Sequence, residues 1–163
     1  MPLPLSADDM RRFIPVGLLL SALALAACSP AGGQKADAQV TIHLVSSGGL
    51  QVPVSVEIAA DNKSQERGLM GRESLKPDEG MLFTFPDNRR LGFWMKNTLI
   101  PLDILFFKDT GEFVSMTTMQ PCTTPVCPPY FSEGSAKFAL EVPAGFIARH
   151  QVERDWKLAL GQW

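Results

Sequence analysis

The sequence lacks the motifs by which common enzyme classes are identified. It has no Gly-x-Ser-x-Gly elbow, no His-Glu-x-x-His pair, no phosphate-binding Gly-x-x-x-x-Gly-Lys loop and no dinucleotide fingerprint. It also lacks an excess of charge, because 15 Lys and Arg stand against 17 Asp and Glu, a net charge of −2. A chain so close to neutral has no electrostatic footprint for nucleic acid. We therefore predict no nucleic-acid partner and name no catalytic residue.

Cysteine and histidine are scarce, with three and two residues respectively. The two histidines, His43 and His150, are far in sequence from any cysteine pair, which disfavours a zinc site. The redox motif Cys-x-x-Cys is missing too. We predict neither a metal nor a cofactor.

The first 27 residues have the pattern of an export signal. Arg11 and Arg12 supply a positive start, and residues 13–25 are apolar apart from Ser21. The ending Leu25-Ala26-Ala27-Cys28 resembles the bacterial lipobox, in which the chain is cut before a lipid-modified cysteine. We predict a lipoprotein signal over 1–27 and lipid on Cys28. This places the protein on a membrane of the bacterial cell envelope, facing the periplasm or the exterior. An ordinary export signal is the alternative.

The segment 28–38 follows as the lipidated Cys28 and a tether of small and polar residues with nothing to bury. Fully extended, residues 29–38 span about 33 Å. The remainder, 39–163, is long enough for one ordinary domain and too short for two. We predict a single domain there.

The remaining cysteines, Cys122 and Cys127, form an even pair once Cys28 carries lipid. In an oxidising compartment we expect them to be joined. The ring would hold six residues, and so short a loop gains only about 2 kcal/mol from the bond. We interpret the pair as a local clip on a proline-rich loop.

Alternation of apolar and polar residues predicts a hairpin of two strands, at 39–45 and 52–58, around Ser46-Ser47-Gly48-Gly49. Asp61 can cap a short helix that runs towards Met70, and Pro143 opens a second helix that ends near His150. Further strands are predicted at 81–85, ended by Pro86, and at 102–107, 113–119, 137–142 and 156–160. Many short strands with two small helices predict an α+β, mainly β domain, a compact antiparallel sandwich or a partly open barrel.

Eight short blocks appear in a fixed order along the domain. They are Val56-Glu57-Ile58-Ala59, Arg67-Gly68-Leu69-Met70, Arg72-Glu73-Ser74-Leu75, Gly80-Met81-Leu82-Phe83, Phe93-Trp94-Met95-Lys96-Asn97-Thr98, Pro101-Leu102-Asp103, Ala139-Leu140-Glu141-Val142 and Ala144-Gly145-Phe146. Over about residues 40–160, the chain resembles the family of bacterial proteins known as domain of unknown function 192. The resemblance implies a compact, strand-rich, exported or membrane-tethered domain, and it implies no activity.

Four residues of these blocks are candidates for a ligand-binding groove: Arg67, Trp94, Lys96 and Asn97. An aromatic face can stack on a ring while the cations hold an anionic or polyhydroxyl ligand. The ligand would be a saccharide or a peptide.

Four more charged residues of the blocks are candidates for structural ion pairs: Glu57, Arg72, Asp103 and Glu141. Asp103 interrupts the most apolar predicted strand, so we expect it to be buried against a cation. The candidate cations are Lys96, Arg67 and Arg72, in that order. We favour structural pairing of these charges over a role in binding, since buried strands need such partners in any protein.

Three function classes follow. The first is a noncatalytic envelope module that binds a ligand or serves as an accessory. The second is an envelope-glycan hydrolase using carboxylates such as Asp103 with Glu141, which requires a suitable distance between them. The third is an interaction module for a membrane partner, which would show an exposed apolar patch. We favour the first class and lean towards no enzymatic activity.

Overall fold

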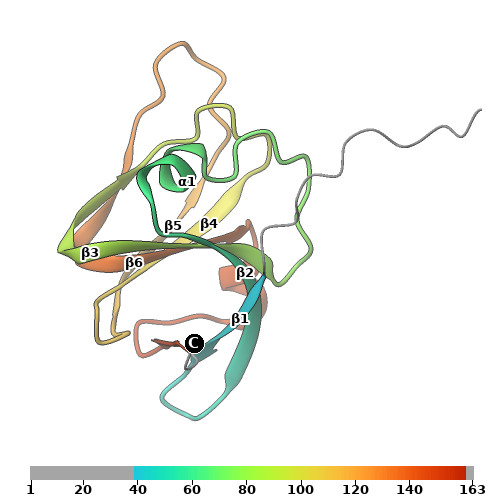
Figure 1. Cartoon of the computed structure of the whole chain (residues 1–163). Helices are drawn as coiled ribbons and strands as arrows, with labels where there is room; N and C mark the ends of the chain where they lie inside the picture. Colours follow the sequence, from blue (N-terminus) through green and yellow to red (C-terminus); the bar gives the residue numbers. More distant parts are fainter. Residues whose placement is uncertain (1–38, 161–163) are drawn as a thin grey trace, which may run out of the picture. The chain divides into compact units, whose positions relative to one another are not determined.

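The computed structural model describes residues 39–160 and shows one curled, mixed sheet of seven strands with two short helices (Figure 1). In chain order the elements are β1 Val40–Val45, β2 Gln51–Ala59, α1 Asn62–Arg67, β3 Glu79–Phe93, β4 Leu102–Phe107, β5 Phe113–Met119, β6 Tyr130–Pro143, α2 Phe146–His150 and β7 Lys157–Ala159. The strand order across the sheet is β5-β4-β6-β3-β2-β1-β7. The predicted strand-rich α+β class is confirmed.

The sheet curls into a partly open barrel. Its two edge strands, β5 and β7, approach each other where Glu112 forms an isolated bridge with Lys157 and Leu158 donates its backbone N–H to Gly111 at 2.8 Å. Gly111 has φ +78° and so closely faces the Leu158 carbonyl that a Cβ would lie 2.2 Å from its oxygen. Only glycine fits this turn, because it combines a left-handed conformation with close backbone approach.

The sheet divides the core between its two faces. The inner face, within the curl, buries residues of most strands together with Phe146 of α2 and Trp156. The outer face buries a second cluster, centred on Met81, Phe83, Ile104 and Phe106 and covered by Leu69 and Met95. Strand β4 lies between the two clusters and is buried along its whole length, as a run that is apolar on both faces apart from Asp103 predicts.

Two features of the sheet differ from the sequence prediction. Strand β2 pairs with β3 in parallel, across the connection that contains α1, whereas the other strand pairs of the sheet are antiparallel. In addition, Pro86 does not end β3. The register between β3 and β6 shifts between Thr84 and Arg89, and the irregularity accommodates the proline.

Helix α1 begins at its predicted capping residue, Asp61, and is shorter than predicted. The Asp61 side chain accepts backbone N–H groups of Lys63 and Ser64, and the Ser64 hydroxyl accepts the N–H of Asp61. This reciprocal arrangement satisfies donors that the first turn leaves unpaired. Gly68, at φ +46°, ends the helix.

Candidate functional site

The sheet sorts the polar candidates onto its two faces. Glu57 pairs directly with Met81, and Met81 pairs directly with Glu141, so the three side chains lie in one row on the outer face. Ile104 continues this row because it pairs with Glu141. Asp103 precedes Ile104 in the strand and therefore points to the inner face.

Glu57 and Arg72 form an ion pair on the outer face. The Glu57 side chain is buried, and Arg72 Nη2 donates to both of its carboxylate oxygens, at 2.6 Å from Oε2. Arg72 belongs to the connection between α1 and β3. The pair therefore fastens this connection to the middle of β2.

A cleft of about 360 Å³ opens between α1 and the sheet. We call it the α1 cleft. Its lining residues come from β2, the start and body of α1, and β3: Glu57, Ile58, Asp61, Lys63, Ser64, Arg67 and Met81. Ile58 and Met81 give it an apolar wall, and the others supply charged and hydroxyl groups. Only Arg67 of this set is predicted from the sequence as a ligand residue, because a capping signal locates Asp61 at the start of a helix but not beside a cleft.

A second exposed feature is the β3–β4 loop, residues 94–101. Trp94 is 46% exposed, and Lys96 Nζ lies 5.1 Å from the centroid of its ring. Between them Met95 is buried, with 1% exposure. The backbone turns at Asn97, which has φ +56° and accepts the N–H of Gly71 at 2.9 Å. The buried Met95 side chain and the hydrogen bond between Gly71 and Asn97 thus both hold the loop against the domain.

The four predicted groove residues fall in two neighbouring places. Arg67 lines the α1 cleft, whereas Trp94, Lys96 and Asn97 belong to the β3–β4 loop and are not among the residues that line this cleft. The hydrogen bond between Gly71 and Asn97 joins the two places.

The surroundings of Asp103 correct the sequence-based expectation of a cationic partner. Asp103 is buried, with 1% exposure, and its carboxylate accepts the Thr118 hydroxyl at 2.7 Å. Its other oxygen accepts the backbone N–H groups of Gly145 and Ile147, both at 2.9 Å. These N–H groups belong to the first turn of α2, so backbone donors supply the compensation for which a cation was expected.

Glu141 also departs from the expected ion pair. Its side chain is 4% exposed, and among the described residues no hydrogen bond or ion pair reaches its carboxylate. Burial without a partner disfavours the charged form and raises the pKa of Glu141 to about 8. Glu141 is therefore a neutral carboxylic acid at pH 7.

The carboxylate pair suggested for glycan hydrolysis does not assemble. Asp103 and Glu141 lie on opposite faces of the sheet, because Glu141 pairs with Ile104 and Asp103 pairs with Val142. Two carboxylates of a glycosidase must flank the same bond. Asp103, in addition, is committed to the first turn of α2.

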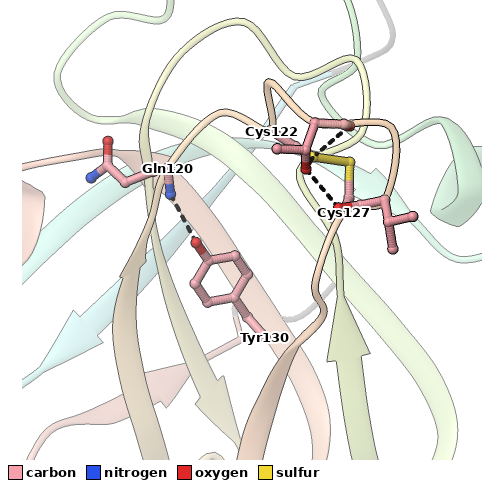
Figure 2. The surroundings of a disulfide bond; sticks show 6 residues. Gln120, Cys122, Cys127 and Tyr130 are labelled. Atoms are coloured by element: carbon pink, nitrogen blue, oxygen red, sulfur yellow. Dashed lines mark hydrogen bonds between the residues drawn. A yellow bond between two sulfur atoms is a disulfide. The ribbon is translucent and has the colours of Figure 1, made fainter.

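The predicted disulfide is present. Cys122 and Cys127 are bonded, with their Cα atoms 5.6 Å apart (Figure 2). They clip the connection between β5 and β6. Beside the clip, the Tyr130 hydroxyl accepts the backbone N–H of Gln120 at 3.3 Å, which joins the two ends of this connection (Figure 2).

Within residues 39–160, no group of three or more His, Cys, Asp or Glu side chains could hold a metal ion. No helix in this range is long and apolar enough to cross a membrane. The proposed lipidation site, Cys28, and the export signal lie outside the described residues.

Two solved structures resemble this one. A protein of Sinorhizobium meliloti 1021, described as a candidate transcription regulator, is 32% identical with a TM-score of 0.70, covering 77% of this chain and 96% of its own. A protein of unknown function from Novosphingobium aromaticivorans DSM 12444 is 27% identical with a TM-score of 0.68, covering 84% and 94%. No curated protein matches the chain significantly.

The match to a family model extends over residues 43–160, which includes both core clusters, the α1 cleft and the clipped connection. The model is that of DUF192, described as an uncharacterized conserved group, and the order of blocks from Val56 to Phe146 agrees with it. The chain belongs to the DUF192 family.

Proposed function

We propose that this protein is a noncatalytic module of the bacterial cell envelope, anchored by lipid on Cys28, that binds a small polar ligand in the α1 cleft. The ligand class is a saccharide or a short peptide. The single observation that carries the proposal is the α1 cleft itself, a recess that combines an apolar wall with both signs of charge.

The cleft has the size and composition of a small-molecule site. Its volume of about 360 Å³ falls in the usual range for such sites, roughly 300–1,000 Å³. The apolar wall of Ile58 and Met81 can cover a sugar face or a peptide side chain. Lys63 and Asp61 supply hydrogen-bonding groups of opposite charge at the rim, which suits a ligand that is polar but not strongly charged.

The cleft is also preformed. The Arg72 guanidinium holds the buried Glu57 carboxylate in place, and the capping of α1 by Asp61 fixes the start of the helix. A site whose walls are already ordered loses little conformational entropy on binding. This preorganisation supports a binding role.

The two buried carboxylates that share the outer face, Glu57 and Glu141, are a second candidate pair for hydrolysis. Two strand spacings place their Cα atoms about 10 Å apart. The buried Met81 side chain occupies the position between them, where a scissile bond would have to lie. We therefore favour binding over hydrolysis.

The test is a thermal-shift screen of the detergent-solubilised full chain against envelope saccharides and short peptides, since a ligand that binds the folded state raises Tm. Lys63→Ala removes a cleft cation, and Lys157→Ala, on the exposed surface of β7, is the matched control. We expect at least one ligand to raise Tm in the parent and in Lys157→Ala, and to raise it less in Lys63→Ala. No shift with any ligand, or equal shifts in both variants, would contradict the proposal.

A further inference from the structure

Two loops run between the same two pairs of strand ends. The end of β3 pairs with the start of β6 through Phe93 and Tyr130, and the start of β4 pairs with the end of β5 through Leu102 and Met119. The β3–β4 loop (94–101) and the β5–β6 loop (120–129) are therefore neighbours in space. We call them together the loop end. The β1–β2 hairpin lies at the opposite end of the sheet (Figure 1).

The loop end exposes large apolar side chains. Trp94 is 46% exposed, Leu99 is 56% exposed and Val126 is 80% exposed. The two loops contain one charged residue, Lys96, and no Asp or Glu. Exposed apolar groups on two neighbouring loops that contain no acidic residue indicate a surface that contacts something other than water.

The apolar side chains are held outward by the structure beneath them. Met95 and Thr98 are buried with 1% and 7% exposure, and the Gly71 N–H binds the Asn97 carbonyl from the side. The disulfide between Cys122 and Cys127 restricts the second loop in the same way. Because both loops are braced, their exposed tips cannot fold back onto the core.

We propose that the loop end rests in the headgroup region of the lipid bilayer to which the chain is anchored. Tryptophan prefers this region, since its ring is apolar and its N–H can still be hydrated. The exposed Lys96 ammonium group, whose Nζ lies 5.1 Å from the centroid of the Trp94 ring, can reach lipid phosphates. Leu99 and Val126 would enter the apolar edge of the same layer.

The chemistry of the loop end favours lipid over a protein partner. Anionic lipids attract the single cation, and the two loops present no carboxylate that they would repel. The tether of residues 29–38 reaches about 33 Å when extended, so the anchored domain can turn its loop end towards the bilayer. This contact is independent of the α1 cleft and of its ligand.

The test is quenching of tryptophan fluorescence by brominated lipids. The full-length, lipid-modified protein is reconstituted in vesicles of phosphatidylethanolamine and phosphatidylglycerol, with and without bromine on the acyl chains. Trp94→Phe keeps an apolar ring and removes one fluorophore, so the difference from the parent reports Trp94 alone. Leu99→Asp places a charge at the loop end, and Leu50→Asp, at the exposed β1–β2 hairpin, is the matched control.

We expect the quenched fraction to fall at least two-fold in Trp94→Phe and in Leu99→Asp, and to stay at the parental value in Leu50→Asp. Equal quenching of parent and Trp94→Phe would overturn the proposal. A separate variant with a photo-cross-linking residue at position 94 gives a second test. A cross-link from this position to one envelope protein, together with no quenching of Trp94 in the parent, would also overturn the proposal, because a protein partner would then occupy the loop end. The mass of each preparation shows whether lipid is attached, which separates loss of the anchor from loss of this contact.

Discussion

Asp103 caps helix α2 through Ile147, whose backbone N–H donates to the Asp103 carboxylate at 2.9 Å across 44 positions of sequence. The contact joins strand β4 to the short helix that closes the inner face. A second N–H, from Gly145, reaches the same oxygen. The carboxylate near the start of the most apolar strand thus has a structural task.

Asp103→Asn should destabilise the protein by about 2 kcal/mol, because a neutral amide accepts the two α2 donors more weakly and brings an NH2 group towards Thr118 or α2. Urea unfolding measures the change. Asp87→Asn, at an exposed position of β3, should unfold at the parental midpoint. A parental midpoint for Asp103→Asn would mean that the cap contributes nothing to stability.

The Glu57–Arg72 pair should respond unequally to loss of its two members. Arg72→Met leaves a buried carboxylate without a partner and should cost about 3 kcal/mol. Glu57→Gln leaves Arg72, whose side chain is 40% exposed and can reach water, so it should cost only about 1 kcal/mol. Chemical denaturation of both variants checks this order. Equal costs, or the reverse order, would show that Glu57 is solvated without Arg72.

Glu141 should make the stability of the protein depend on pH. Its pKa in the folded protein is raised from 4.5 to about 8, so the unfolded chain loses this proton first as the pH rises. The stabilising effect of the neutral acid is complete below pH 4.5 and is lost between about pH 4.5 and pH 8. The free energy of unfolding, measured across this range, should fall in the parent.

In Glu141→Gln, which cannot ionise, this part of the pH dependence should disappear. Glu153→Gln, at an exposed position, should keep the parental profile. If Glu141→Gln and the parent gave parallel curves from pH 4.5 to pH 8, Glu141 would have an ordinary pKa and hence a charge in the folded protein.

The clip between Cys122 and Cys127 should contribute about 2 kcal/mol, the value expected for so short a ring. Replacing both cysteines by serine should lower the unfolding midpoint accordingly and leave the far-UV circular dichroism spectrum unchanged. The parent measured with a reductant is the control. A loss of several times this size would mean that the clip holds the sheet and not only its loop.

The local features of the fold could be predicted from the sequence. Alternation located β1 and β2, the capping residue Asp61 located α1, and the pairing of the two remaining cysteines located the disulfide. These signals act between residues that are near each other in the chain.

The partners of the buried carboxylates could not be predicted, because they depend on contacts distant in sequence. Asp103 is compensated by backbone donors of α2, which no composition or spacing reveals. Glu141 is buried with no such donor, and whether it is paired depends on what lies across the outer face. The prediction that Pro86 ends its strand was wrong for a related reason. An irregular register between β3 and β6 lets β3 continue past the proline.

Both proposals place the protein on a membrane, and the mass of the chain extracted from bacterial membranes tests that placement most directly. The account predicts a mature chain that begins at Cys28 and carries lipid on this residue. A chain that begins elsewhere, retains residues upstream of Cys28, or has an unmodified Cys28 would contradict it.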